Sequence, residues 1–196
     1  MPVTYDKKAK RFRDSKGRFI SPKAVRREID KLVQVSAQRL EQAAKDLANG
    51  KITIEEFQNR TRNILKASYT LSGAVAKGGW KQMSQSDWGK IGAETKKQYG
   101  YLNKFAKVIV AGITLAALLS RVKLYATGIR TVFNNSDLDA KKQAGEFTLC
   151  KRVLNARESC SQCSGWARKG FVPIDEQPKI GSLICRNFCR CFFEYQ

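Results

Sequence analysis

Five of the six cysteines in this 196-residue chain lie in two short clusters, so the last third of the chain must fold in a way that accounts for them. The first cluster is the Cys-x-x-Cys pair Cys160 and Cys163, and the second holds Cys185, Cys189 and Cys191. This arrangement is typical of a structural zinc site, in which two short loops close around one tetrahedral ion. The glycines and prolines between the clusters predict a turn-rich connection with few strands.

The chain contains no histidine, so a zinc ion here would be held by thiolates alone. The five clustered thiols outnumber the four coordination positions of such an ion. We assign Cys160, Cys163 and Cys185 to the predicted ligand set. If the C-terminal tail is a strand, Cys189 and Cys191 point in opposite directions, and only one of them faces the ion. A closed four-thiolate site has no open coordination position, so we expect it to stabilise the fold and not to catalyse a reaction.

Two other states of the cysteines stay open: disulfide bonds, and reduced thiols without a ligand. Residues 1–27 are charged and lack the apolar core of a secretory signal peptide, which favours a reducing compartment and hence a metal. The longest uncharged, mostly apolar run, residues 108–120, is too short to cross a bilayer and predicts a core helix, so no membrane association is expected. The sixth cysteine, Cys150, is expected to pack as a small apolar residue.

The chain is strongly basic, with 37 Lys and Arg against 17 Asp and Glu and a net charge of +20. Such an excess indicates a polyanionic partner, most commonly nucleic acid, although a basic surface can also serve solubility alone. Residues 1–20 form a basic arm that we expect to be mobile and to settle on a partner protein or on phosphates, without sequence specificity. Its candidate contact residues are Lys7, Lys8, Lys10, Arg11, Arg13, Lys16 and Arg18.

Residues 21–145 carry the apolar periodicity of a helical body with about four helices. Ser21 and Pro22 predict the start of a long first helix that ends at Asn49 and Gly50. A capping box at Thr53 predicts the start of a second helix, which stops at residues 78–79. The short turn between the two helices indicates an antiparallel hairpin.

The third and fourth helices are predicted with less regular boundaries. Ser86 or Asp87 is expected to cap the third helix, and the glycines along it allow a break near residues 99–100. The fourth helix is expected to run from Thr114 to about Asn134, and residues 136–145 read as a polar connection. The alternation from Phe147 onward then predicts a strand that leads into the first cysteine pair, and residues 190–195 predict a closing strand.

These patterns predict a mainly α (α+β) protein: the basic arm, an elongated helical body of about four helices, and a small β-containing cysteine-rich module at residues 146–196. No enzyme is expected. Without histidine there is no imidazole base and no Ser-His or Cys-His pair, and no phosphate-binding loop or dinucleotide fingerprint occurs in the sequence.

The motifs of the last 50 or so residues resemble those of tailed-phage minor head, or head morphogenesis, proteins. The segments that carry the resemblance are Cys160-Cys163, Phe171-Val172-Pro173-Ile174, Pro178-Lys179-Ile180-Gly181-Ser182, Cys185-Cys189-Cys191 and Tyr195. Shorter similar segments occur at residues 13–19, 79–83 and 98–102. Members of that family often carry a histidine near the first cysteine pair or before the terminal Cys-Arg-Cys, where this chain has Ser159 and Cys185.

The resemblance implies a structural virion component that lies near the portal vertex, is assembled in the host cytoplasm and helps to build the phage head. Its implied partners are the portal and capsid proteins, further copies of the same chain, and packaged DNA. The main alternative is a zinc-stabilised DNA-binding regulatory protein. That alternative requires a recognition helix with exposed Arg, Asn or Gln beside the zinc module, and no convincing one is evident in the sequence.

Overall fold

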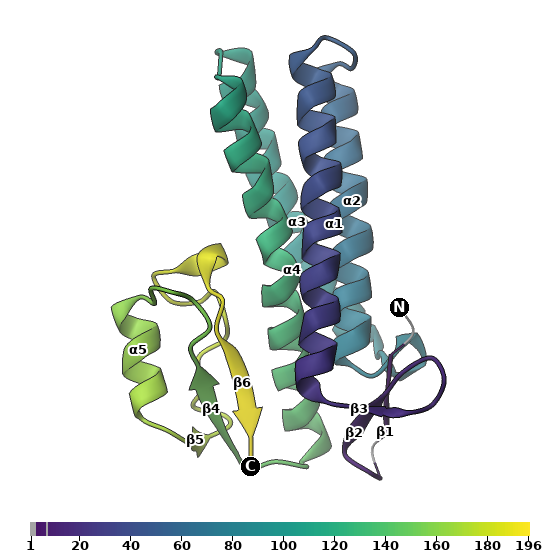
Figure 1. Cartoon of the computed structure of the whole chain (residues 1–196), viewed down its shortest axis with the longest axis vertical. Helices are drawn as coiled ribbons and strands as arrows, with labels where there is room; N and C mark the ends of the chain where they lie inside the picture. The colour runs from purple at the N-terminus through teal and green to yellow at the C-terminus, as the bar shows by residue number, and fades with distance from the viewer. Residues whose placement is uncertain (1–2, 7) are drawn as a thin grey trace.

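The computed structural model describes residues 3–6 and 8–196, which form five α-helices and two three-stranded sheets. The body is built from α1 (Pro22–Ala48), α2 (Ile54–Ala76), α3 (Gln85–Val110) and α4 (Leu115–Ala144), which stand side by side along the long axis (Figure 1). Helix α4 packs against both α1 and α2, and α3 packs mainly against α2. The prediction of a mainly α protein with an elongated four-helix body is therefore confirmed.

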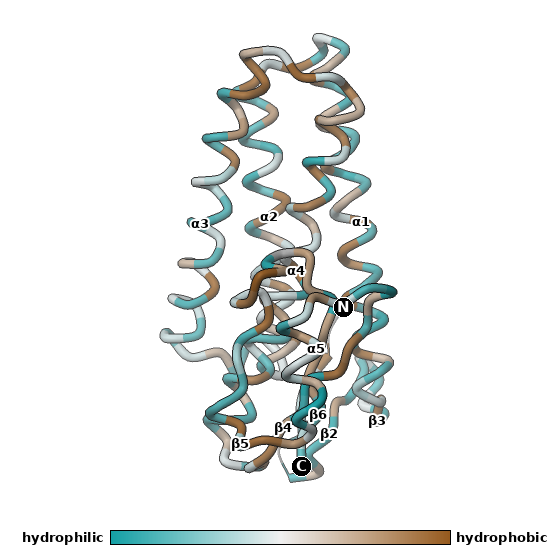
Figure 2. The backbone as a smooth tube through the Cα atoms, turned by 90° about the vertical axis from the view of Figure 1, so that its left-hand side faces the viewer, coloured by the Kyte–Doolittle hydropathy of each residue, from teal (hydrophilic) through white to brown (hydrophobic). Residues whose placement is uncertain are grey.

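Side-chain caps start the helices where the sequence predicts them. Ser21 Oγ accepts a hydrogen bond from Ala24 N at 3.2 Å, and Thr53 Oγ1 accepts one from Glu56 N at 3.1 Å. Each cap satisfies a backbone donor that the first helical turn leaves free. Hydrophobic and hydrophilic residues alternate along the four long helices in Figure 2. Their apolar faces meet in one core, whose fully buried side chains include Leu40, Leu65, Tyr69, Leu102 and Ile129.

Two predicted helix boundaries are wrong. Helix α3 begins two or three residues earlier than expected because Ser84 is its N-cap and forms a complete capping box with Asp87. It continues through residues 99–100 without a break. Helix α4 does not end near Asn134 but continues to Ala144, where Gly145 adopts the left-handed conformation. The polar residues 136–145 stay helical because this part of α4 packs against both small sheets, with Leu138 fully buried.

The described part of the basic arm, residues 3–6 and 8–20, is folded, whereas the sequence predicted a mobile arm. It folds into an antiparallel sheet of β1 (Thr4–Asp6), β2 (Arg11–Arg13) and β3 (Phe19–Ile20) at the lower end of the bundle (Figure 1). Phe12 is buried in the main core, and Tyr5 donates a hydrogen bond from its hydroxyl to Glu146 Oε2 at 2.6 Å. These contacts offset the entropy lost on ordering the arm.

The C-terminal module lies beside the lower half of α4 (Figure 1) and holds a second sheet in the order β5-β4-β6. Its strands are β4 (Leu149–Val153), β5 (Val172–Pro173) and β6 (Phe192–Tyr195), and both outer strands pair antiparallel with β4. The strand predictions around β4 and β6 are confirmed. The connection between the cysteine clusters is less irregular than predicted, because it contains the helix α5 (Ser161–Arg168) as well as β5.

The module has its own core and is anchored to α4 by paired hydrogen bonds. Asn135 Nδ2 donates to Ile180 O at 3.0 Å, and Ile180 N donates to Asn135 Oδ1 at 2.8 Å. Two residues further along α4, Asp137 accepts a hydrogen bond from the Tyr195 hydroxyl at 2.7 Å. None of the helices in the described part of the chain is long and apolar enough to cross a membrane.

The close approach of α2 and α4 depends on a glycine and gives a test of the packing. A Cβ atom on Gly128 would collide with the phenol of Tyr69, which is fully buried and donates a hydrogen bond to Tyr125 O at 3.2 Å. We expect Gly128→Ala to lower the free energy of unfolding by about 1–3 kcal/mol, because overpacking forces neighbouring atoms apart.

Gly92→Ala is the matched control for this substitution. Gly92 also lies inside a long helix, but apart from its chain neighbours and the backbone of its own helix no described atom lies within 4 Å of its added Cβ. Because alanine favours the helix, we expect Gly92→Ala to raise the free energy of unfolding by about 0.5–1 kcal/mol. Urea unfolding of both variants measures the difference. Equal effects of the two substitutions would contradict the described packing of α2 on α4.

Candidate metal centre

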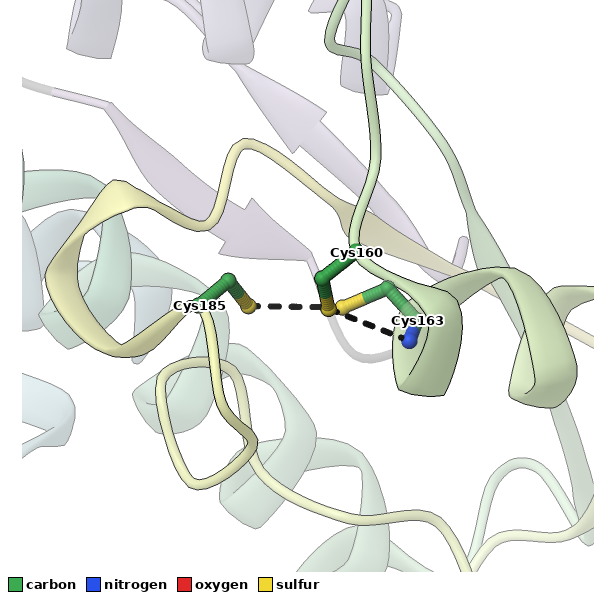
Figure 3. Close-up of side chains that lie close together, drawn as sticks. All are labelled: Cys160, Cys163 and Cys185. Carbon is green, nitrogen blue, oxygen red and sulfur yellow. Dashed lines mark hydrogen bonds between the residues drawn. The ribbon is translucent and has the colours of Figure 1, made fainter.

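Five cysteines from separate segments of the module come together beside β4. Cys160 is the N-cap of α5, and its sulfur accepts a hydrogen bond from Cys163 N at 3.3 Å. The Cys-x-x-Cys pair is therefore held in a helical turn that brings both sulfur atoms to one side. Cys185 approaches from the opposite loop, just before the short 3-10 helix η2 (Arg186–Phe188), so that its sulfur faces Cys163 (Figure 3).

The sulfur atoms form two groups of three that share Cys163. Cys160, Cys163 and Cys185 make the first group, and Cys163, Cys189 and Cys191 make the second, with all sulfurs of a group within 4.8 Å of one another. The Cys163 sulfur lies 3.5 Å from that of Cys185 and 3.7 Å from that of Cys189. A tetrahedral ion with bonds of about 2.3 Å separates its sulfur ligands by about 3.8 Å. The spacing within each group therefore suits thiolate ligands of a metal ion, and all six cysteines are free in the structure.

The sequence predicted that only one of Cys189 and Cys191 faces the ion, and the structure places the sulfurs of both beside that of Cys163. Both side chains are buried, at 4% and 3% exposure, and both sulfurs lie in the second group. The alternation of a strand does not apply to them because β6 begins only at Phe192, and Cys189 follows directly on η2. The two thiols can therefore both face Cys163, and five sulfurs stand close to a site that needs four.

Arg152 is a buried cation directed at the cysteine cluster. This β4 residue is only 2% exposed, and its Nη1 lies 3.7 Å from the Cys163 sulfur and 3.9 Å from the Cys189 sulfur. Its Nη2 donates to the carbonyl of Pro178, and its Nε has no hydrogen-bond partner. No ion pair to Arg152 is present among the described carboxylates. A buried guanidinium without a carboxylate is costly unless another negative group compensates it. The ring of Phe193 lies 5.4 Å from the guanidinium but carries no net charge, so among the described residues beside Arg152 the thiolates are the groups that could compensate it.

The surroundings of the clustered thiols shift their pKa values in different directions. A hydrogen bond from Cys191 lowers the pKa of Cys189 to about 5. The same hydrogen bond, together with burial, raises the pKa of Cys191. Burial also raises the pKa of Cys163 and of Cys185. Within the second group, these shifts favour the thiolate form of Cys189 and the thiol form of Cys191.

The remaining predicted residues have different surroundings. Cys150 is fully buried in the core of the module, outside both groups, and burial raises its pKa to about 11.

In the basic arm, Arg13 pairs with Asp6 at 2.8 Å and Arg18 pairs with Asp14 at 2.8 Å, while Arg11 lies over the ring of Phe19. Lys10 donates to Glu146 O at 3.2 Å, Lys8 and Lys16 are exposed, and Lys7 lies outside the described residues.

Sequence reasoning missed Arg152 as part of the site. Its only signal was a basic residue at an inward position of a predicted strand, on the same face as Cys150. That position is unusual because charged residues are almost never fully buried unless they are paired. Comparisons with known proteins add no residue: no family model, no curated protein and no solved structure matches this chain.

Proposed function

We propose that the cysteine cluster holds one structural zinc ion, with Cys160, Cys163, Cys185 and Cys189 as its ligands and Cys191 as a thiol that donates to Cys189. The observation that carries the proposal is the approach of buried Arg152 to the sulfurs of Cys163 and Cys189. Four thiolates around a divalent ion leave a net charge of −2, and Arg152 partly compensates it. Neutral thiols would leave the same guanidinium buried without a counter-charge.

The proposed metal ion would join three segments of the module and would have no coordination position for a substrate. Four protein thiolates fill a tetrahedral site, so no position is left for water or a reactant. Zinc also suits soft sulfur ligands, and its binding would connect α5, the loop before η2 and the start of the tail. Because the module's own core is small, we propose that metal binding supplies much of its folding free energy.

We propose further that the chain is a structural, non-enzymatic protein of a tailed-phage particle, placed near the portal and assembled with portal or capsid protein and with other copies of itself. Two features support this role: the resemblance of the cysteine-rich module, and apolar residues exposed at the far end of the bundle. At the turn between α3 and α4, Val110 is 72% exposed and Leu115 is 47% exposed. Exposed apolar residues gathered at one site are typical of a surface that another protein covers.

Incorporation into particles tests this role. In the organism that encodes the chain, sedimented particles should contain it in a fixed ratio to portal protein. The double variant Val110→Lys/Leu115→Lys should lower its incorporation about tenfold or more, because two charges would be buried in the contact. The matched control is Lys96→Gln/Lys104→Gln, which changes exposed residues on the same helical pair and should leave incorporation unchanged.

Absence of the wild-type chain from particles would contradict the structural role. A protected footprint at one preferred DNA sequence, without any particle association, would instead indicate the regulatory protein considered as the alternative. Zinc content tests the metal site, and particle association tests the structural role. A zinc content of about one ion per chain would therefore leave the proposal for the metal site intact, whatever the result for the particles.

A further inference from the structure

A cleft of about 410 Å³ lies where the helical body meets the cysteine-rich module. Its walls come from three separate parts of the chain: the first turns of α1, the middle of α4, and the module between β4 and β6. We call it the basic cleft, after its cationic lining residues Lys23, Arg26, Arg27, Arg130 and Arg190.

The positive charge of the basic cleft is largely uncompensated. Asp30 is the one carboxylate in the described lining. It forms an ion pair with Arg130, with 2.6 Å between Arg130 Nε and Asp30 Oδ1. Lys23, Arg27 and Arg190 are exposed and form no ion pair within the described part of the chain. Like charges held at this density repel one another, and an anion in the cleft would relieve the repulsion.

The position of these cations on α1 adds to the imbalance. Lys23 lies in the first turn of α1, which contains no acidic residue, and Arg26 and Arg27 follow on the next turn. The amino-terminal end of a helix already carries a partial positive charge, so cations there are less favourable than carboxylates. Arg26 is held in place by the ring of Phe192, which lies 4.0 Å from its guanidinium carbon. Glu194, Asp137 and Asp30 lie near enough to act on Arg26 electrostatically, but no ion pair to it occurs within the described residues.

We propose that the basic cleft binds consecutive phosphates of a nucleic-acid backbone. Three features favour phosphates over the carboxylates of an acidic protein segment. Four of the five cations are arginines, whose planar forks match phosphate oxygens. The cleft is larger than a single phosphate and open to solvent, as a continuous strand requires. The net charge of +20 would also draw a polyanion to the surface from a distance.

The inference deepens the proposed function, because Arg190 lies between Cys189 and Cys191 and would be positioned by the metal-bound module. It also moves the expected DNA contact. The sequence placed that contact on the basic arm, but Arg13 and Arg18 of the arm are already paired with carboxylates. In the basic cleft, Lys23, Arg27 and Arg190 have no such partners within the described residues, and the site needs both the helical body and the module.

The test uses the full-length, zinc-loaded chain and a fluorescently labelled DNA duplex of mixed sequence, titrated at several salt concentrations. The cleft variant is Lys23→Gln/Arg27→Gln/Arg190→Gln, which changes three exposed residues. The control variant is Lys96→Gln/Lys104→Gln/Lys107→Gln, which removes the same charge from exposed positions on α3. Both variants have the same net charge, so any difference between them reports the location of binding.

We expect the cleft variant to bind the duplex about 10- to 100-fold more weakly at low salt, and its slope of log affinity against log salt to become shallower by about 2.7, or about 0.9 per lost phosphate contact. The control should stay within about threefold of the wild type. Equal losses in both variants would overturn the proposal, since they would indicate a diffuse cationic surface. The affinity for poly-glutamate is measured in the same way. If the cleft variant lost as much affinity for poly-glutamate as for the duplex, the proposal would be overturned in favour of an acidic protein partner.

Zinc content and thermal unfolding, measured on each variant, separate this inference from the proposed metal site. A wild-type chain that holds no metal but loses DNA binding in the cleft variant would contradict the metal proposal alone. A chain that keeps its zinc in all variants and shows no difference between the cleft and control variants would contradict the cleft alone.

Discussion

Cys163→Ser is expected to abolish stoichiometric zinc binding and to unfold residues 146–196 while the helical bundle persists. Cys163 is 1% exposed and is the one sulfur shared by both groups of the cluster. Its loss removes a ligand and also the centre to which Cys185 and Cys189 are closest. Structural zinc contributes about 10–16 kcal/mol in small zinc-finger peptides, so a site of this kind cannot lose a central ligand and remain stable. Metal analysis and hydrogen exchange measure the two effects.

Two substitutions serve as matched controls for Cys163→Ser. Cys150→Ala also changes a fully buried cysteine of the module, but one outside both sulfur groups. It should cost about 1 kcal/mol in packing and leave the zinc content near one ion per chain. Cys191→Ser should likewise retain zinc, since its hydroxyl can still donate to Cys189, whereas Cys189→Ser should not. Retention of zinc by Cys163→Ser would show that the metal is bound elsewhere.

Arg152→Met is expected to have opposite effects on the metal-loaded and the metal-free chain. In the loaded chain the guanidinium compensates the charge of the thiolates, so its removal should weaken zinc affinity by about 10- to 100-fold. In the metal-free chain the same guanidinium is buried without a carboxylate, and an apolar side chain of similar length should raise the free energy of unfolding by about 1–4 kcal/mol. Competition with a chelator measures the first effect, and urea unfolding in excess chelator measures the second.

The control for Arg152→Met is Arg168→Met, which removes the same charge from an exposed position on α5 of the same module. It should change neither zinc affinity nor stability by more than about 0.5 kcal/mol. If Arg152→Met destabilised the metal-free chain as strongly as the loaded one, Arg152 would act through packing alone. The argument from charge for the metal site would then be wrong.

The helical body could largely be predicted because the signals that start its helices are local. Ser21, Thr53 and Thr114 each cap the helix that follows them in sequence, so neighbouring residues alone decide where those helices begin. The errors arose where tertiary contacts decide. Helix α4 keeps its last turns because Leu138 and Asp137 pack against the module, and the basic arm folds because Phe12 enters the main core. Such contacts join residues far apart in the sequence and leave little periodic signal.

The spacing of the cysteines predicted that they come together, but nothing in the sequence predicted that the buried cation Arg152 lies beside them. Spacing alone predicts that Cys160, Cys163 and Cys185 come together, because a Cys-x-x-Cys pair followed by a second cysteine cluster is typical of two loops that close around one ion. The orientation of Cys189 and Cys191 depends on where β6 begins, which the aromatic tail does not reveal. The role of Arg152 depends on the packing of β4 under α5, and no sequence motif marks it.

Native mass spectrometry of the purified full-length chain, prepared without added metal or chelator, tests the metal site most directly. We predict a chain that carries one zinc ion, with all six cysteines reduced once the metal is removed by acid. A metal-free chain whose mass is lower by two protons for each disulfide bond would contradict the account, because the sulfur atoms would then be joined to one another and not to an ion.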